Sequence, residues 1–367
     1  MDYYYKYIKY RQKYLSLKYA FVQSDTSDRI LGGKRISKKN KRNIYNQLEI
    51  TVLKQGTKSD KVLSCSYFTM KEAYRIVEKY QNNLKRFIET KKQLKGFETR
   101  IYTDDSGKEY ALEVAKNDPS VSVYYFNFPP LKEENAHIGT FGTYVRFMPL
   151  FEKGLKIVWV SDIDIPNHYL DPSIISNAQQ SNADFCYRTY VCYERKLYGR
   201  IYSILAGTMM SFITFPEEIF NNFLNELVYP SNKFLNNLEG LNKANQLKGK
   251  PYSKIPYGFD EIFTNQIIYN YLIKKSLKCY ILKDYINAGK YLQYNKLISR
   301  EEDKILFIYY HDPSDDLFQK IKKMFKEKLP LLTEHECLQD MLKIFDSFKS
   351  SLVLPIIRKG KELDEKI

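Results

Sequence analysis

The sequence predicts an α/β protein in which helices flank a sheet. Beyond residue 50, short apolar runs alternate with longer segments of helical periodicity, the order typical of a parallel sheet covered on both faces. The chain has 367 residues, of which 44% are hydrophobic, and this is enough for the large core of such a fold. It contains 33 tyrosines and 22 phenylalanines, so we expect aromatic rings to supply much of the packing area.

The elements can be assigned in order along the chain. Strands are expected at 61–67, 97–103, 121–126 and 155–160, and helices at 71–94, 110–115 and 140–151. The apolar run 304–310 predicts a further strand, and residues 331–367 are expected to form a helical tail. We therefore expect one α/β domain, preceded by a separate segment, 1–45.

The opening segment is basic and rich in tyrosine. Residues 3–19 predict an amphipathic helix, with tyrosines at helical spacing on one stripe, and residues 23–41 resemble a linker. Residues 1–60 contain 14 Lys and Arg against 5 Asp and Glu, although the net charge of the whole chain is only +15. Such an arm indicates an acidic partner, namely nucleic acid, a membrane surface or an acidic protein; a solvated arm without a partner is the simpler alternative.

Cysteine usage and hydropathy limit the class of protein. The five cysteines are scattered and form no Cys-x-x-Cys pair, which argues against a disulfide scaffold or a zinc site and for a reducing compartment. The start of the sequence does not resemble a secretory leader, and no window reaches the roughly 18 apolar residues of a membrane span. We therefore expect a cytoplasmic protein without a transmembrane segment.

Polar side chains that follow the expected strands are the first candidates for a site, because ligands of such sheets bind beyond the carboxyl ends of the strands. By position alone, Ser66 and Tyr67 are expected to face a ligand after the first strand, and Asp104 after the second. Asp162 and Asp164 follow the most apolar strand, 155–160. Two carboxylates at this spacing can approach one cation, and Mg²⁺ typically takes one or two carboxylates plus substrate phosphates. The simpler interpretation is a pair of surface aspartates at the end of a strand that cap a helix before Pro166.

Four segments in order resemble a known family. They are Thr-Tyr-Val-Arg-Phe-Met-Pro-Leu-Phe at 143–151, Lys-Ile-Val-Trp-Val-Ser-Asp-Ile-Asp-Ile at 156–165, Ile-Leu-Ala-Gly-Thr-Met-Met-Ser-Phe at 204–212, and Phe-Asp-Glu-Ile-Phe-Thr-Asn at 259–265. Together they resemble nucleotide-sugar glycosyltransferases of the GT-A fold, and most closely the glycogenin-like and galactosyltransferase group. The chain departs from that pattern at Leu205, where the group has Asn, and at Glu261, where Gln is usual. Residues 3–19 also resemble the Tyr/Lys-rich opening of many proteins from giant viruses of the mimivirus group, which would place the protein in the host cytoplasm or the virion.

The resemblance implies a GT-A type, Rossmann-like mixed sheet and a metal-dependent transfer of a sugar. Residues 46–170 would bind the donor, a nucleoside-diphosphate sugar and most simply a UDP-sugar, and residues 171–330 would bind a glycan or protein acceptor. Asp162 and Asp164 would hold Mn²⁺ or Mg²⁺ together with the donor's ribose and diphosphate.

The other roles are carried over in the same way. Arg146 would reach the diphosphate or the sugar, and Gly207 would lie beside the donor sugar. Asp260 or Glu261 would contact sugar hydroxyls or act as the base, with retention or inversion left open. His311 would be a third metal ligand, because it follows the expected strand 304–310.

Two alternatives remain open from the sequence. A phosphatase of the haloacid-dehalogenase type also places Asp-x-Asp after an apolar strand, but there the motif opens its domain. A non-catalytic protein that binds sugar or nucleic acid is the second alternative. The chain has no Walker-type phosphate loop, no dinucleotide fingerprint and no Gly-x-Ser-x-Gly elbow, which disfavours those three classes of enzyme.

Overall fold

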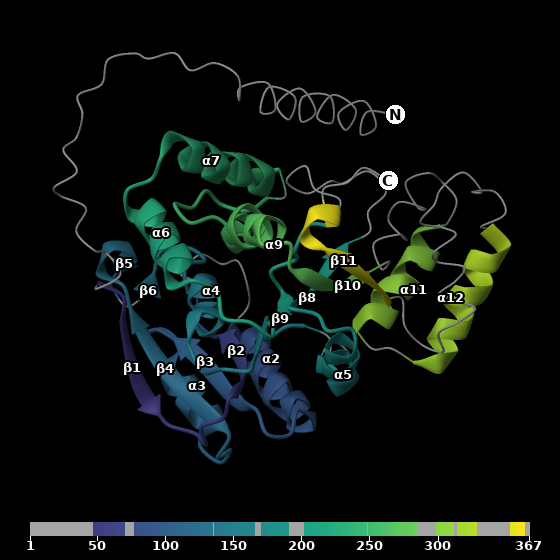
Figure 1. Ribbon diagram of the computed structural model, residues 1–367, viewed down its shortest axis with the longest axis horizontal. Coiled ribbons are helices and arrows are strands. Elements are labelled where there is room, and N and C mark those ends of the chain that lie inside the picture. The colour runs from purple at the N-terminus through teal and green to yellow at the C-terminus, as the bar shows by residue number, and fades with distance from the viewer. Residues whose placement is uncertain are drawn as a thin grey trace. The chain divides into compact units, whose positions relative to one another are not determined.

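The computed structural model describes most of the chain after residue 46 (Figure 1). The described residues are 47–69, 77–134, 136–165, 170–190, 202–247, 249–284, 299–311, 314–328 and 353–363. All of them belong to one compact unit that spans 43–367. The expected N-terminal helix and linker lie outside the described residues.

A nine-stranded mixed sheet runs through the described part of the chain, in the order β1-β4-β3-β2-β7-β9-β8-β10-β11. The strands are β1 (Glu49–Lys54), β2 (Lys61–Ser66), β3 (Glu98–Thr103), β4 (Val121–Asn127), β7 (Ile157–Ser161), β8 (Phe185–Tyr190), β9 (Thr208–Ser211), β10 (Lys278–Asp284) and β11 (Val353–Lys359). A separate pair is formed by β5 (Lys132–Glu133) and β6 (Ala136–His137). The α/β class and the mixed sheet predicted from the sequence are confirmed.

Six strands of the sheet run in one direction, and β1, β9 and β11 run in the opposite direction. β4, β3, β2 and β7 run parallel to one another, whereas β9 is antiparallel to both β7 and β8. β2, β3 and β7 are buried along nearly their whole length, as expected for strands covered on both faces, whereas the edge strand β1 is largely exposed. This burial explains why β7 appears in the sequence as a continuous apolar run, whereas β3 instead buries an ion pair between Glu98 and Arg100.

Helices cover both faces of the sheet and bury two separate aromatic and aliphatic cores (Figure 1). On one face lie α2 (Val77–Thr90), α3 (Lys108–Ala115) and α5 (Pro172–Gln180). On the other face lie α4 (Gly142–Val145), α6 (Glu217–Val228), α7 (Asn232–Gln246), α8 (Phe259–Ile262), the π-helix η8 (Phe263–Ile268) and α9 (Tyr269–Lys274). Alternate residues of one strand serve the two cores: Trp159 packs with α2 and α3, and Val160 with α4 and α6.

The expected strand at 304–310 is wrong, because this run belongs to helix α11 (Arg300–His311). The helix begins with a reciprocal capping arrangement: the backbone N–H of Glu302 donates to Ser299 Oγ (3.2 Å), and the N–H of Ser299 donates to the Glu302 carboxylate (2.6 Å). The sequence Ser-x-x-Glu before the apolar run is therefore the signal that decides between strand and helix. A second helix, α12 (Asp315–Lys328), follows.

The expectation of a helical tail is also wrong for residues 353–359, which form β11. This strand pairs antiparallel with β10 and is the last strand of the sheet. Pro355 is tolerated there because an edge strand needs backbone hydrogen bonds on one side only. The tail therefore completes the sheet beside β10 and ends in a short 3₁₀ turn, Gly360–Leu363.

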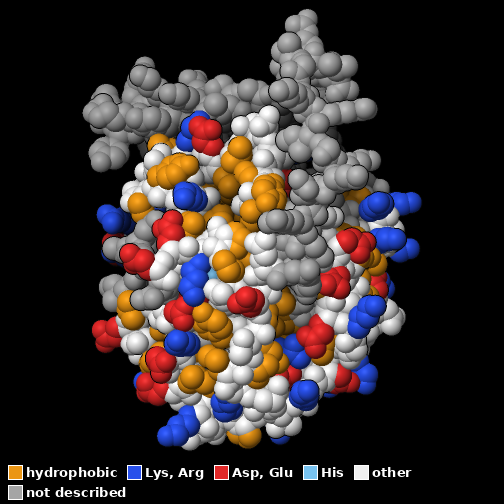
Figure 2. Space-filling view, turned by 90° about the vertical axis from the view of Figure 1, so that its left-hand side faces the viewer, with side chains coloured by type: hydrophobic (Ala, Val, Ile, Leu, Met, Phe, Trp, Pro, Cys, Tyr) orange, Lys and Arg blue, Asp and Glu red, His pale blue; other side chains and the backbone are white. Residues whose placement is uncertain are grey.

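Charge is mixed on the described surface. Figure 2 shows Lys and Arg side chains interspersed with Asp and Glu on the face that it presents, without a patch of one sign. Among the described residues, no helix is long and apolar enough to span a bilayer.

Candidate active site

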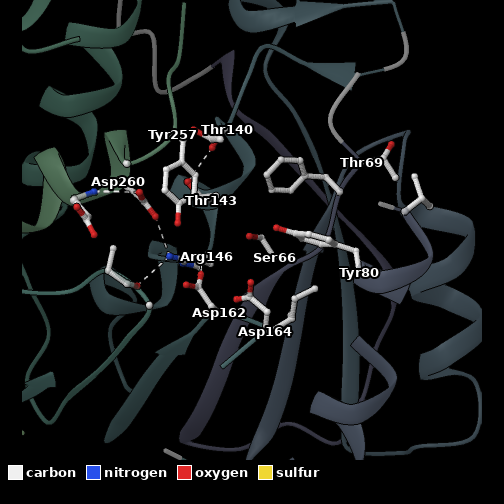
Figure 3. Close-up of a pocket in the computed structure, with 17 residues that line it drawn as sticks. Ser66, Thr69, Tyr80, Thr140, Thr143, Arg146, Asp162, Asp164, Tyr257 and Asp260 are labelled. Carbon is white, nitrogen blue, oxygen red and sulfur yellow. Dashed lines mark hydrogen bonds and ion pairs between the residues drawn. The ribbon is translucent and has the colours of Figure 1, made fainter. Parts of the chain in front are cut away.

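A pocket opens at the carboxyl ends of the parallel strands β2 and β7 (Figure 3). It is lined by Ser66, Phe68, Thr69, Val77, Tyr80, Thr140, Thr143, Arg146, Asp162, Ile163, Asp164, Ala206, Gly207, Tyr257, Gly258, Asp260 and Glu261. Segments from both halves of the chain therefore meet here. Of the sequence-predicted site residues, the pocket brings together Ser66, Arg146, Asp162, Asp164, Gly207, Asp260 and Glu261.

Arg146 connects the two acidic parts of the pocket. Its Nη1 donates to Asp162 Oδ1, and its Nη2 donates to Asp260 Oδ2 (2.9 Å) and to the carbonyl oxygen of Ala206 (2.9 Å). These contacts are drawn as dashed lines in Figure 3. The guanidinium thus joins the end of β7, the segment before β9 and the start of α8 in one hydrogen-bonded group.

The Arg146 side chain is only 3% exposed, and a hydrogen bond from strand β2 holds the Arg146 backbone. Ser64, on the β2 face that points toward α4, donates from its hydroxyl to the carbonyl oxygen of Arg146 (2.6 Å). Burial by itself lowers the pKa of the guanidinium, but the charges of Asp162 and Asp260 outweigh it and raise the pKa. Arg146 is therefore a permanent buried cation. Its guanidinium points at the carboxylates of Asp162 and Asp260 and not at solvent.

Asp162 is held against Gly207 by a backbone contact. The N–H of Asp162 donates to the carbonyl oxygen of Gly207 (2.7 Å), which continues the pairing of β7 with β9 by one residue. A Cβ atom at position 207 would lie 2.9 Å from Asp162 Oδ2. Glycine is therefore required for the carboxylate to occupy this position, and the Ala-Gly sequence in the segment before β9 has a steric reason.

Asp260 and Glu261 enter the pocket from the first turn of α8. Gly258 precedes them with φ of 88°, a conformation that favours glycine, and it turns the chain into the helix. Asp260 is 9% exposed, and its Oδ1 accepts a hydrogen bond from the N–H of Glu261 (3.1 Å). Asp260 is thus fixed, and both carboxylates lie at a helix start, where a negative charge is favoured.

Asn265 links the two segments that the resemblance had paired by order alone. Its Oδ1 accepts from the N–H of Ile204 (2.8 Å), and its Nδ2 donates to the carbonyl oxygen of Ile204 (2.8 Å). Asn265 lies in the π-helix η8, a rare form that often marks functional sites. The buried amide therefore holds the segment carrying Ala206 and Gly207 against the helix that carries Asp260.

The charges of the pocket are mostly negative. Among the described residues that line it, four carboxylates (Asp162, Asp164, Asp260 and Glu261) accompany one cation, Arg146. Within the described part of the chain, no three His, Cys, Asp or Glu side chains are grouped to hold a metal ion. The carboxylates at 162 and 164 nevertheless fit a hard divalent cation, since Mg²⁺ is usually bound by one or two carboxylates together with substrate phosphates.

Tyr67 and Asp104 lie outside the pocket. Tyr67 is 1% exposed and packs in the core against Tyr110, with ring centroids 5.6 Å apart; burial raises the pKa of its phenol to about 12. Ser66 and Phe68 on either side of it face the pocket instead. Successive side chains at the end of β2 alternate between the two faces of the sheet, so Ser66 and Phe68 face the pocket and Tyr67 faces the core.

Asp104 is fully buried, and its carboxylate accepts hydrogen bonds from neighbouring protein groups. Its Oδ2 accepts from the N–H of His137 (3.1 Å) and from His137 Nδ1 (3.1 Å), and its Oδ1 accepts from the N–H of Ser106 (3.0 Å). The N–H of Phe128 donates to His137 Nε2 (2.9 Å), so the imidazole proton lies on Nδ1, facing Asp104. The neighbouring Asp105 is paired with Lys132 (2.6 Å).

Replacing Asp104 by alanine should lower the free energy of unfolding by about 3 kcal/mol, because several buried donors would lose their acceptor. Urea denaturation followed by circular dichroism measures this. Asp60→Ala is the control, since Asp60 pairs with exposed Lys156 and its loss should leave the urea midpoint near that of wild type. Equal midpoints for the two variants would contradict the structural role of Asp104.

His311 is the last residue of helix α11, so it does not follow a strand as the resemblance required. The sequence also missed Phe68, Thr69, Val77, Tyr80, Thr140, Thr143 and Tyr257. Thr69 and Phe68 carry the same positional signal as Ser66, because they follow β2. Tyr257 carries no such signal, because it lies in an irregular segment far from the sheet in sequence.

No protein-family model and no curated protein matches this chain. The residues and geometry of the pocket are therefore the basis for a function.

Proposed function

We propose that this protein is a metal-dependent glycosyltransferase of the GT-A type, which moves a sugar from a nucleoside-diphosphate sugar to a hydroxyl group of an acceptor. One observation carries the proposal. Asp162 and Asp164, at the end of β7, share a pocket with Asp260 and Glu261, and Arg146 binds one carboxylate of each pair. The order of the four sequence segments supports the same interpretation.

The excess of negative charge among the described residues of the pocket favours a metal cofactor. A nucleoside diphosphate is an anion, and the described carboxylates of the pocket would repel it. A Mn²⁺ or Mg²⁺ held there would supply the missing positive charge and would stabilise the departing diphosphate. Asp162 and Asp164 would hold the cation, and Arg146 keeps Asp162 in place while partly neutralising it.

The carboxylates at the start of α8 suit the sugar side of the reaction. Asp260 and Glu261 can accept hydrogen bonds from sugar hydroxyls, and either can take the proton that the acceptor hydroxyl releases. The hydrogen bond from Arg146 Nη2 fixes Asp260 Oδ2, while Asp260 Oδ1 is near the backbone of Glu261. Asp260 is thus a rigid carboxylate, and Glu261 is its neighbour on the same helical turn.

Release of nucleoside diphosphate from a panel of nucleotide sugars should require Mn²⁺ or Mg²⁺. Protein stripped with EDTA should be inactive and should recover activity when either metal is added back. The measurement is a coupled assay of nucleoside diphosphate across uracil, guanine and adenine donors. Full turnover in excess EDTA would contradict the assignment of Asp162 and Asp164.

A phosphate assay with phosphomonoesters and a titration with ligands, run beside the donor assay, separate the alternatives. A phosphatase of the haloacid-dehalogenase type would release inorganic phosphate from phosphomonoesters and leave nucleotide sugars intact. A non-catalytic binding protein would bind the metal and nucleotide, or an oligosaccharide, without turnover in any donor.

A further inference from the structure

Strand β1 forms one edge of the nine-stranded sheet (Figure 1). In the described part of the chain it pairs with β4 on one side and with no strand on the other. Val52 is 46% exposed and Leu53 is 38% exposed, so two aliphatic side chains of this edge strand lie in solvent. Such an edge presents unpaired backbone N–H and C=O groups, to which a further strand can bind.

The opposite edge of the described sheet is protected in a way that β1 is not. β11 carries Pro355, which has no backbone N–H, and ends in the basic pair Arg358 and Lys359. Proline and charged side chains on an edge strand oppose its pairing with another chain. The sequence of β1, Glu-Ile-Thr-Val-Leu-Lys, contains no proline and carries its two charges at its ends. Of these two edges, β1 is therefore the one suited to accept another strand.

A β-bulge near the end of β1 brings both of its charges onto one face of the sheet. The pairing with β4 shifts register between Val52 and Lys54, which leaves Leu53 as the extra residue. Because alternate residues of a strand point to opposite faces, Lys54 would lie on the other face from Glu49 without this shift. With the shift, Glu49, Thr51 and Lys54 share one face.

These three residues are self-complementary about a two-fold axis at Thr51. When two copies of β1 run antiparallel about that axis, Thr51 faces its own copy, and Glu49 of each chain faces Lys54 of the other. On the opposite face, Ile50 of one chain faces Val52 of the other. Pairs of threonines, of aliphatic side chains and of opposite charges are all favourable across strands. A parallel pairing in register would instead oppose like charges.

Both charged groups have bonding capacity left for a partner. The Lys54 ammonium donates to the carbonyl oxygens of Asp118 (2.8 Å) and Val121 (2.6 Å), which uses two of its three N–H groups. Glu49 accepts from Asn127 Nδ2 (2.9 Å) at Oε2. Burial lowers the pKa of Lys54, so a carboxylate that approaches its third N–H would stabilise the charged form.

We propose that this protein forms a two-fold symmetric dimer in which the β1 strands of two copies pair antiparallel and join the two sheets. Strands β4 and β3 separate β1 from β2, and no residue of β1 lines the pocket, so the interface is independent of the proposed function. Two paired strands of six residues each make a small interface, so the dimer should be reversible.

The test is sedimentation equilibrium of the full chain over about 1–200 μM, where the wild type should show a monomer–dimer equilibrium. Glu49→Lys and Lys54→Glu each oppose like charges at both symmetric contacts and should each weaken dimerisation by at least about tenfold. Thr51→Lys opposes two lysines on the axis and should cause the same loss without removing the contacts of Lys54. Lys320→Glu, at an exposed residue of α12, is the charge-matched control and should dimerise as wild type does. Melting curves verify that each variant is folded.

A mixture of two variants tests the register. In an equimolar mixture, Glu49→Lys has two lysines to face the two glutamates of Lys54→Glu, so this pair should dimerise nearly as wild type does. Weakening by both single variants without recovery in the mixture would contradict the antiparallel pairing about Thr51. A wild type that stays monomeric throughout would overturn the proposal and mean that another segment of the chain or another protein covers the edge. Equal dimerisation of all variants would place the interface elsewhere and overturn it as well.

Discussion

Replacement of Arg146 by methionine should lower the free energy of unfolding by about 3–5 kcal/mol, the usual cost of removing one member of a buried ion pair. Methionine keeps much of the side-chain volume but leaves Asp260, whose side chain is 12% exposed, and Asp162 without their shared cation. Asp162 is 37% exposed and can be solvated, so most of the cost comes from Asp260. Urea denaturation followed by circular dichroism measures the change.

Two further variants identify the cause. Arg146→Met combined with Asp260→Asn removes the uncompensated charge and should recover part of the lost stability, which a simple packing defect would not. Lys156→Met is the surface control, because Lys156 is 77% exposed in its pair with Asp60 and should leave the midpoint unchanged. If Arg146→Met unfolds at the wild-type midpoint, the guanidinium bridge does not hold the site together.

The central sheet could be predicted because its strands are buried on both faces. Strands β2, β4 and β7 each appear in the sequence as a largely apolar run, and all four strands, the more polar β3 included, lie within one or two residues of the bounds expected from the sequence. The parallel direction of β2 and β7 then places Ser66 and Asp162 at one edge, so this part of the pocket follows from topology. Local pattern and tertiary structure agree here.

The rest of the site depends on contacts distant in sequence. Asp104 and Asp162 both follow buried strands, yet Asp104 is used by His137, 33 residues later, and is lost to the site. The Asp-Asp-Ser-Gly sequence at 104–107 signals a local turn, in which Asp104 accepts from Ser106, but it does not reveal the pairing with His137. Tyr257 reaches the pocket because Asn245 of α7 holds its backbone, a contact that no periodicity reports. Position after a strand therefore identifies candidates, and tertiary hydrogen bonds decide which of them face the ligand.

The strand wrongly predicted at 304–310 has a different cause, because the signal against it is local. The run 304–310 is apolar enough for a strand, but Ser299 and Glu302 before it form the reciprocal cap of a helix. Here the deciding information is local and present in the sequence. The cap at Ser299 and Glu302 therefore predicts a helix over 300–311, and His311 then lies at a helix end and not after a strand.

Asp164→Asn and Asp260→Asn should cause different defects, because the two carboxylates lie in different parts of the pocket. Asp164→Asn keeps the size of the side chain but removes a charge beside the expected diphosphate, so it should weaken the affinities for Mn²⁺ and for nucleoside diphosphate together. Asp260→Asn should bind nucleoside diphosphate nearly as wild type does and lose turnover by about 10²–10⁴-fold, the range for a single acid–base group. Titration of both ligands and a turnover assay with the preferred donor measure these effects.

Arg146 makes the comparison sharper, because its guanidinium binds Asp260 directly, whereas the charge of Asp164 acts on it only by raising its pKa. Asn at 260 retains an oxygen that can accept from Nη2, so the position of Arg146 and hence of Asp162 should be preserved. Unchanged binding with lost turnover would therefore assign Asp260 to the sugar or acceptor side. If Asp164→Asn binds the metal and nucleotide as wild type does, the assignment of the cation to β7 is wrong; if Asp260→Asn turns over normally, the catalytic role passes to Glu261 on the next position of α8.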